Sequence, residues 1–372
     1  MLILGIETSC DETAAALVEI NSTVEKEKIK IISNVVSSQI KIHQKYGGIV
    51  PEVAARAHLE KILTIVTKAL GNNKKKIDLI SVTIGPGLIT SLLVGIETAK
   101  TLAYTWNKPI IGINHLEGHI YANWLKPVSE ISNYKLQTTN CKLFPALCLI
   151  VSGGHTELIL MKDHLKYKKI GQTKDDAAGE AFDKTARLLN LEYPGGPAIA
   201  INAAKFLISS ASWQIQFPNS LRCPSEQEFK ISLPRPMINS GDYNFSFSGL
   251  KTAVLYQLKT DKNWKEKIPE YCYEFQQAVI DVLISKTLKA AKEHKVKTII
   301  LAGGVVANNE LQKQFKHRLK VISDQLKANL LIPEKNLCGD NAAMIAMAGY
   351  FNALKNKYTP WQKLKPNPNL EL

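Results

Sequence analysis

The chain lacks the features of several large protein classes. No apolar run among its 372 residues reaches the ~18 residues that a membrane-spanning helix needs. The first residues, Met1–Glu7, contain neither a basic and apolar leader with a cleavage site nor an arginine-rich amphipathic presequence. We therefore expect a cytoplasmic protein without membrane contact.

Cysteine is sparse and scattered. None of the six residues forms a Cys-x-x-Cys pair, which argues against a disulfide framework or a zinc ribbon and fits a reducing compartment. The chain also has no Gly-x-x-x-x-Gly-Lys-Ser/Thr and no Gly-x-Gly-x-x-Gly, so a P-loop enzyme or a nicotinamide dehydrogenase is not indicated. The six cysteines are Cys10, Cys141, Cys148, Cys223, Cys272 and Cys338.

Positive charge is in excess. The chain has 47 Lys and Arg residues against 33 Asp and Glu residues, a net charge of +14. Such an excess favours a polyanionic partner such as nucleic acid. The sequence is also rich in Lys, Ile and Asn, which a biased genome composition alone can produce, so charge by itself leaves both interpretations open.

Apolar periodicity predicts α/β structure in two halves. We expect strands at 2–9, 13–20, 29–36, 78–84, 109–113, 146–151, 156–161 and 298–302, and helices at 51–70, 88–106, 177–189 and 309–319. Both halves follow the order hairpin, third strand, helix, strand, helix. This order indicates a duplicated α/β architecture with a cleft between the halves.

The predicted domain organisation follows from this repeat. We expect an N-terminal lobe at 1–125, a linker insertion at 126–144, and a C-terminal lobe at 145–334 with an insertion near 209–232. We expect the helices of about 335–372 to pack back on the first lobe, and the proline-rich tail 360–372 to be extended or frayed.

Two histidines four residues apart are the most informative feature. His115 and His119 follow the apolar run 109–113, and positions i and i+4 lie side by side on a helix, so both rings can reach one metal ion. A metalloprotease helix would place glutamate directly after the first histidine, whereas Glu117 comes one residue later. Asp340, before an Ala- and Met-rich helix, is either that helix's N-cap or a third, carboxylate ligand.

Glycine-bearing turns follow several apolar strands. Glycine lets backbone N–H groups approach an anion closely, and the start of a following helix favours negative charge. Asp11, in the first hairpin turn, is placed to bind a cation or a water molecule beside a phosphate. Together these turns favour a nucleotide in the cleft. They are Gly85-Pro86-Gly87, Ser152-Gly153-Gly154, Gly195-Gly196 and Gly303-Gly304.

Eight motifs are spread over nearly the whole chain. They are Gly5-Ile6-Glu7-Thr8-Ser9-Cys10-Asp11-Glu12-Thr13, Gly47-Gly48-Ile49-Val50-Pro51-Glu52 with Arg56 and His58, Asn114-His115-Leu116-Glu117-Gly118-His119, Ser152-Gly153-Gly154-His155-Thr156, Asp175-Asp176-Ala177-Ala178-Gly179-Glu180-Ala181-Phe182-Asp183-Lys184, Tyr193-Pro194-Gly195-Gly196-Pro197, Phe245-Ser246-Phe247-Ser248-Gly249-Leu250-Lys251-Thr252 and Gly339-Asp340-Asn341. Together they resemble one family, TsaD, the bacterial tRNA N6-adenosine threonylcarbamoyltransferases of the ASKHA (actin, sugar kinase, Hsp70) superfamily. The two insertions are longer than that family usually needs.

The resemblance implies a duplicated actin-like, ribonuclease H-like two-lobe fold and a specific reaction. The threonylcarbamoyl group of threonylcarbamoyl-adenylate would pass to N6 of adenosine 37, in tRNAs that read codons beginning with A, with release of AMP. The implied partners are tRNA, a TsaB-like paralogue and a TsaE-like ATPase.

By the same resemblance, the site residues fall into three groups. One divalent metal ion, Fe²⁺ by preference or Zn²⁺, would bind His115, His119 and Asp340. Asp11 and Glu12 would lie on the phosphate side of the cleft. The acyl-adenylate would contact Ile150, Val151, Ser152, Gly153, Gly154, Asp183, Gly196 and Asn308.

Several assignments stay open at this stage. No general base is evident: His155 is a candidate by position, but a structural role in orienting its turn is favoured. Asp183 could be a solvated helix residue, and Asn308 an ordinary turn residue before a cap at Asn309. The competing functions are an O-sialoglycoprotein endopeptidase, a small-molecule kinase and a non-catalytic scaffold.

Overall fold

The computed structural model describes residues 1–22, 27–73, 76–125, 143–216 and 231–372. Most of the two predicted insertions therefore lies outside the described residues. The segment 209–216, expected to be a loop, instead continues helix α6 (Gly195–Gln216). Within the described ranges, no helix combines the length and apolar character that crossing a membrane would require.

The first lobe is built on a five-stranded sheet in the order β3-β2-β1-β4-β5. Strands β1, β2 and β3 pair antiparallel, and β1, β4 and β5 pair parallel. The strands are β1 (Leu2–Glu7), β2 (Glu12–Ser22), β3 (Glu27–Ser38), β4 (Leu79–Gly85) and β5 (Ile110–Asn114), and the helices are α1 (Ile40–Gln44), α2 (Pro51–Leu70), α3 (Ile89–Trp106), α4 (His115–Tyr121) and α11 (Ala342–Leu354).

The second lobe repeats this topology. Its sheet has the order β10-β9-β6-β7-β8, with β6, β7 and β8 antiparallel and β6, β9 and β10 parallel. The strands are β6 (Ala146–Val151), β7 (Thr156–Asp163), β8 (Lys166–Gln172), β9 (Thr298–Ala302) and β10 (Asn329–Leu331); the helices, besides α6, are α5 (Ala178–Leu188), α7 (Ser248–Thr260), α8 (Ile268–Glu293), α9 (Asn309–Val321) and α10 (Lys335–Cys338). The matching strand orders confirm the predicted duplicated, actin-like two-lobe fold.

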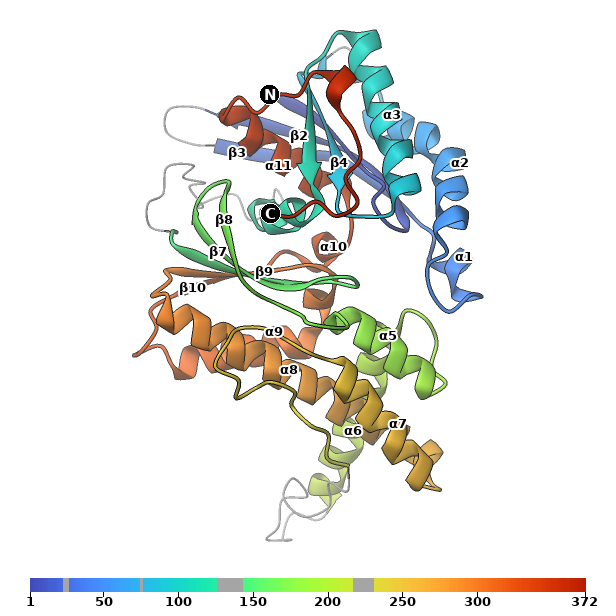
Figure 1. The fold of residues 1–372 in the computed structure, drawn as a ribbon, viewed down its shortest axis with the longest axis vertical. Coiled ribbons are helices and arrows are strands. Elements are labelled where there is room, and N and C mark those ends of the chain that lie inside the picture. The colour runs from blue at the N-terminus through green and yellow to red at the C-terminus, as the bar shows by residue number, and fades with distance from the viewer. Residues whose placement is uncertain (23–26, 74–75, 126–142, 217–230) are drawn as a thin grey trace.

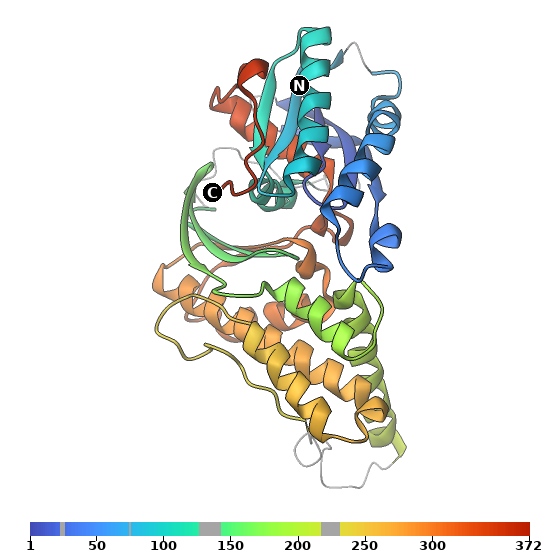
Figure 2. The ribbon, with the colours of Figure 1, turned by 45° about the vertical axis from the view of Figure 1, so that its right-hand side comes forward.

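Three apolar cores hold the layers together (Figures 1 and 2). One lies between the first sheet and helices α2 and α3, a second lies between the two sheets, and a third joins the second sheet to helices α5–α9. Alternate residues of β6 enter different cores: Leu147 and Leu149 face the helices, whereas Cys148 and Ile150 face the first lobe. Because both faces of the sheet are buried, the sequence of β6 is a continuous apolar run without alternating polar residues.

Helix α11 belongs to the core between the sheets. It packs on β1 and on α4, and nearly all of its residues are buried. A helix surrounded by protein on all sides needs no polar face, which explains why α11 is almost entirely apolar and rich in Ala and Met. The helix therefore brings the residues just before it, near 340, to the junction of the two lobes.

The C-terminal tail, 360–372, begins with a 3-10 turn at Trp361–Lys363, continues as a largely extended segment, and is not frayed. Leu364 is buried in the first lobe, and the backbone N–H of Asn367 donates to the carbonyl of Ile84 at 2.7 Å. The contact requires glycine at Gly85: its φ is 151°, and a Cβ atom there would lie 1.8 Å from the Asn367 carbonyl oxygen. Tertiary hydrogen bonds that the local sequence does not reveal thus order the tail, which lies along the ends of β4 and β5 (Figure 1).

Gly5 sets how closely α11 approaches β1. A Cβ atom at this position would lie 2.1 Å from the Ala342 carbonyl oxygen. We expect Gly5→Ala to push the first turn of α11 away and to lower the free energy of unfolding by about 1–3 kcal/mol. Urea denaturation measures this change. The control is Gly249→Ala at an exposed position of α7 with no atom near the new methyl group, which should leave stability unchanged or raise it; equal losses in both variants would contradict the packing argument.

Candidate metal centre in the interlobe cleft

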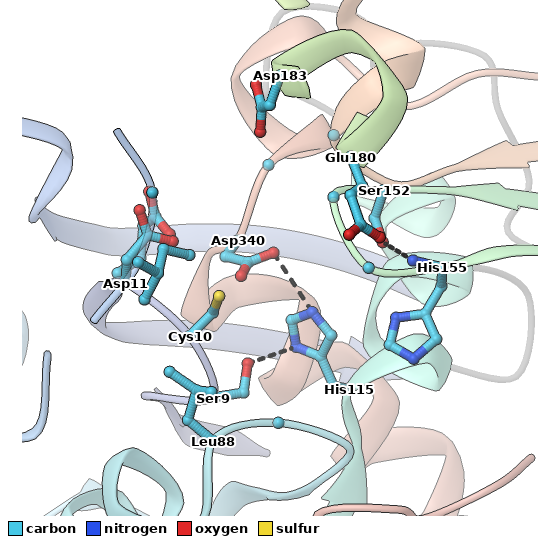
Figure 3. A pocket seen from close by; sticks show the side chains of 18 of the residues that line it. Ser9, Cys10, Asp11, Leu88, His115, Ser152, His155, Glu180, Asp183 and Asp340 are labelled. Carbon is cyan, nitrogen blue, oxygen red and sulfur yellow. Dashed lines mark hydrogen bonds and ion pairs between the residues drawn. The ribbon is translucent and has the colours of Figure 1, made fainter. Parts of the chain in front are cut away.

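A cleft of about 660 Å³ lies between the lobes. Its first-lobe wall comes from the turn after β1 and the turn after β4, and its second-lobe wall from the β6–β7 turn and from α5. Figure 3 shows Cys10 and Asp11 on one side, Ser152 and His155 on the other, and His115 with Asp340 between them. Two of the predicted metal ligands, His115 and Asp340, therefore line the same cavity as some of the predicted substrate residues, and His119 lies buried behind them.

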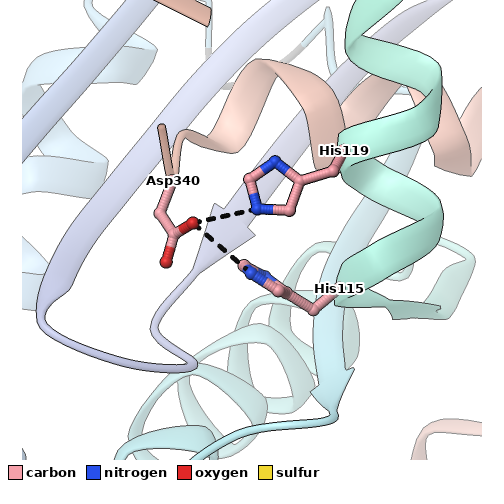
Figure 4. A group of neighbouring side chains, drawn as sticks. All are labelled: His115, His119 and Asp340. Atoms are coloured by element: carbon pink, nitrogen blue, oxygen red, sulfur yellow. Dashed lines mark ion pairs between the residues drawn. The ribbon is translucent and has the colours of Figure 1, made fainter. Parts of the chain in front are cut away.

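The two histidines are positioned by the start of α4. β5 ends at Asn114, whose side-chain oxygen accepts from the backbone N–H of Leu116 at 2.8 Å and so caps the helix. His115 and His119 then occupy adjacent turns of one helix face, with ring centroids 4.7 Å apart. Both side chains point from α4 toward Asp340 (Figure 4).

Asp340 is not the N-cap of α11. That role belongs to Asn341, whose side-chain oxygen accepts from the backbone N–H of Met344 at 3.0 Å. The Asp340 carboxylate instead faces the histidines, with Oδ1 3.4 Å from His115 Nε2 and 3.1 Å from His119 Nε2. The open choice between cap and cluster member is thereby decided in favour of the cluster.

The three side chains have the arrangement that a cation requires. Their ligand atoms lie within 4.8 Å of one another. The His119 ring is almost fully buried; its Nδ1 has no hydrogen-bond partner among the described residues, and its Nε2 faces the Asp340 carboxylate. Two ligand atoms each ~2.05 Å from one tetrahedral ion are separated by about 3.3 Å, close to the distances observed here. The donor set, two imidazoles and a carboxylate, thus fits one divalent metal ion.

Carboxylates lie on both sides of the His115 ring: Asp340 at the cleft and Glu7 behind it. Burial alone would raise the pKa of Asp340, but His115 and His119 hold that pKa well below its usual range. On the far side of the His115 ring, Nδ1 lies 2.9 Å from Glu7 Oε2 and 3.1 Å from Ser9 Oγ. We did not predict Glu7 as a site residue; the available signal was a single acidic residue at the end of the apolar run 2–6.

Several predicted substrate residues line the cleft and others do not. Ser152, Gly153 and Gly154 line it, as does Asp183, which accepts from the backbone N–H of Gly195 at 2.7 Å. Burial, the largest influence, raises the pKa of Asp183. Ile150, Val151, Gly196 and Asn308 are not among the lining residues.

Ile150 and Val151 have their side chains in the apolar cores on opposite faces of β6. Asn308 is the N-cap of α9: its side-chain oxygen accepts from the backbone N–H groups of Glu310 and Leu311. Its amide nitrogen donates to Gln276 at 2.8 Å. The cap lies at Asn308, one residue earlier than the predicted cap Asn309, because only Asn308 keeps the extended backbone of a cap.

The phosphate-side candidates and His155 also line the cleft. Burial, followed by the charges of Asp340 and Asp11, raises the pKa of Glu12 to about 10. Burial, followed by the charges of His115 and His119, lowers the pKa of His155 to about 4. The backbone of His155 closes the turn, because its N–H donates to Ser152 Oγ at 3.2 Å and its carbonyl accepts from the Ser152 N–H at 2.8 Å.

Helix α5 contributes cleft residues that we did not predict. Glu180, Lys184 and Arg187 share the face of Asp183 at helical spacing, which is the signal that could have identified them. Lys184 pairs with Glu180 at 2.8 Å, and Arg187 donates across the cleft to the Gly47 carbonyl oxygen.

Glu117 does not take part in the cluster. Its carboxylate accepts from the side chain of Asn352 on α11 at 2.8 Å, burial raises its pKa to about 7, and it is absent from the lining of the cleft. A metalloprotease would need this carboxylate at the metal. The geometry therefore agrees with the sequence argument against a protease.

The fold and the cleft define a two-lobe, actin-like protein with a potential metal site between its lobes. The family "TsaD: tRNA N6-adenosine threonylcarbamoyltransferase" matches residues 30–347. The chain belongs to this family and is thus a transferase.

Relatives support the assignment along the whole chain. The tRNA N6-adenosine threonylcarbamoyltransferase of Geobacillus kaustophilus (strain HTA426) is 44% identical over 375 residues, covering 100% of this chain and 96% of the relative. That of Thermosipho melanesiensis (strain DSM 12029 / CIP 104789 / BI429) is 48% identical over 354 residues, covering 94% of each. The solved structure of T. kodakarensis HypF aligns with 98% of this chain and 49% of its own, at 14% identity and a TM-score of 0.49, too low to support a functional argument.

His58 supports the cleft wall through hydrogen bonds to Cys10 and Thr13, and its burial makes the stability of the fold depend on pH. The side chain is fully buried, its Nε2 donates to the Cys10 carbonyl at 3.0 Å, and its Nδ1 accepts from Thr13 Oγ1 at 2.8 Å. Burial lowers its pKa most; the Cys10 carbonyl, Glu7 and Asp11 oppose that shift, and His43 adds to it.

Below the ordinary histidine pKa of about 6.5, the unfolded chain binds a proton that folded His58 does not. We therefore expect stability to fall as pH falls through that value, and His58→Gln to reduce the slope by up to about 1.4 kcal/mol per pH unit. Urea unfolding at several pH values from 7.5 to 5 measures both slopes. Identical slopes would show that His58 takes up its proton equally in both states.

Proposed function

We propose that this protein transfers the threonylcarbamoyl group from threonylcarbamoyl-adenylate to N6 of adenosine 37, in tRNAs that read codons beginning with A, and releases AMP. Membership of the TsaD family supports the reaction class. The observation that carries the proposal is the convergence of His115, His119 and Asp340 at the wall of a cleft that is also lined by an exposed glycine turn.

The proposed reaction does not require the protein to form a covalent bond with its substrate. The exocyclic amine of adenine is a poor nucleophile, but the acyl-adenylate is a mixed anhydride and already activated, so no covalent enzyme intermediate is needed. Holding the amine and the carbonyl in line can supply much of the rate enhancement. The protein's task is to position both substrates and to stabilise the departing AMP.

The β6–β7 turn suits the acyl-adenylate. Gly153 and Gly154 are exposed, and no atom lies within 4 Å of the position that a Cβ would occupy at either residue. Their backbone N–H groups are thus open to an anionic or carbonyl oxygen. Across the cleft, Asp183 can accept from a ribose hydroxyl, and Asp11 and Glu12 border the phosphate side.

The metal-binding side chains are His115, His119 and Asp340, with Fe²⁺ as the preferred ion and Zn²⁺ as the alternative. When bound, such an ion supplies Lewis-acid polarisation and a fixed point for a substrate oxygen. His155 is uncharged near neutral pH, because its pKa is about 4. That pKa makes it a weak base, so orienting the turn suits it better than proton abstraction.

The proposed partners are tRNA, a TsaB-like paralogue and a TsaE-like ATPase, all in the cytoplasm. The net charge of +14 suits tRNA. On α2, Leu59 is 64% exposed and Leu63 is 68% exposed, which offers an apolar surface for a paralogue.

His119 gives the decisive test of the metal's role. We expect His119→Ala to lower formation of the modified adenosine at least about 100-fold, since loss of a ligand should exceed the 10- to 100-fold effect of losing an outer-shell partner. The assay supplies threonylcarbamoyl-adenylate, unmodified tRNA and the partner proteins, and analyses nucleosides by mass spectrometry. The control, His317→Ala, removes an exposed imidazole on α9.

Equal product from wild type and His119→Ala would remove the metal from the mechanism. Absence of product from the wild type with all partners present would contradict the proposed reaction itself. Cleavage of a glycoprotein or ATP-dependent phosphorylation of a sugar or acid by the same preparation would favour the endopeptidase or the kinase instead.

Gly153 tests the glycine turn without disturbing the core. We expect Gly153→Val to weaken acyl-adenylate binding about tenfold or more, a loss of ~1.4 kcal/mol, because the new side chain would stand where the substrate approaches the backbone. Calorimetric titration with a non-hydrolysable analogue measures the affinity. Thermal unfolding should be nearly unchanged, because the site is open; unaltered affinity would mean that the turn does not contact the substrate.

A further inference from the structure

A fully buried carboxylate lies directly behind one of the proposed metal ligands. Glu7, at the end of β1, is 0% exposed, and its Oε2 lies 2.9 Å from His115 Nδ1. Two other donors serve the same carboxylate: the Ser9 N–H donates to Oε1 at 2.5 Å, and Thr83 Oγ1 donates to Oε2 at 2.6 Å. Hydrogen bonds from Ser9 and Thr83 thus fix the Glu7 carboxylate, and its third partner is the proposed metal ligand His115.

This arrangement determines which His115 nitrogen carries hydrogen. The Glu7 oxygens already accept from an N–H and an O–H, so the carboxylate acts as an acceptor and Nδ1 of His115 must donate to it. The Nε2 atom is the ring nitrogen that faces the cleft, 3.4 Å from Asp340 Oδ1. A proton on Nε2 can serve this pair in the metal-free protein, and a divalent cation that replaces the proton receives the Nε2 lone pair while Nδ1 keeps its hydrogen bond to Glu7.

We propose that Glu7 is a positioning residue for the metal centre: it fixes the tautomer and ring orientation of His115 so that Nε2 is available as a ligand. This inference rests on the proposed metal site. A carboxylate behind a metal-bound imidazole also increases the basicity of the ligand. Glu7 itself does not line the cleft.

The same carboxylate connects the metal centre to the wall of the cleft. Ser9 donates its backbone N–H to Glu7 and places its hydroxyl 3.1 Å from His115 Nδ1, and it begins the cleft-lining segment 9–12. Loss of Glu7 should therefore disturb the ligand ring and the start of this segment together.

The test measures metal affinity in the absence of substrates. The probe is Zn²⁺, titrated in competition with a chromophoric chelator, into wild-type protein and into Glu7→Gln, Thr83→Val and Glu117→Gln variants. We expect Glu7→Gln to bind Zn²⁺ 10- to 100-fold more weakly, about the effect of losing an outer-shell partner. Glutamine keeps the size of the side chain but places an amide donor against either Nδ1–H or the Ser9 N–H.

The other two variants separate positioning from general stability. Thr83→Val removes a donor to Glu7 without changing a charge, so a smaller, severalfold weakening is expected. Glu117→Gln makes the same acid-to-amide change at a buried site on the metal helix, but Glu117 contacts Asn352 and not a ligand, so its Zn²⁺ affinity should match the wild type.

A spectroscopic measurement completes the test. In ¹⁵N-histidine-labelled, Zn²⁺-loaded wild type, we expect His115 to show a protonated Nδ1 and a metal-bound Nε2. Wild-type Zn²⁺ affinity in folded Glu7→Gln or Thr83→Val, equal losses in Glu7→Gln and Glu117→Gln, or a metal-bound Nδ1 would each overturn the inference. Because no substrate is present, these results are independent of whether the transfer reaction itself is observed.

Discussion

Three electron-pair donors from distant parts of the chain converge on one point between the lobes, and the site depends on this convergence. His115 and His119 approach Asp340 within 3.4 and 3.1 Å, and His119 Nδ1 has no hydrogen-bond partner among the described residues. Buried polar atoms are rarely left without a partner. One divalent cation could bind all three side chains at once, which is why we propose a metal centre beside the cleft.

The duplicated fold makes this convergence possible. Each lobe has a sheet of the same strand order, and the two sheets face each other across a shared apolar core that contains α11 and α4. Packing of α11 on β1 brings residue 340 beside the helix that begins where β5 ends. The two histidines thus come from a helix, and Asp340 from the bend just before another helix, and burial of apolar area sets the positions of both helices.

Much of this could be predicted from the sequence, for reasons that are local. A helix places residues four apart side by side, so the His115–His119 pair was visible as a ligand pair, and glycines after apolar strands marked the turn at 152–154. Repetition of the element order predicted the duplication. The capping residues were less certain, because Asp340 and Asn341, or Asn308 and Asn309, are equally good caps by type and differ only in backbone conformation.

The sequence by itself determined the two-lobe architecture, the histidine pair and the glycine turns, because periodicity and spacing along one segment encode them. Tertiary structure alone decided that Asp340 faces the histidines, that Glu7 supports His115 from behind, that Asn308 caps a helix, and that the tail 360–372 is ordered against β4. Each of these outcomes depends on a contact between residues far apart in the chain or on the backbone angles at one residue. Long-range contacts and single backbone angles leave no local pattern in the sequence.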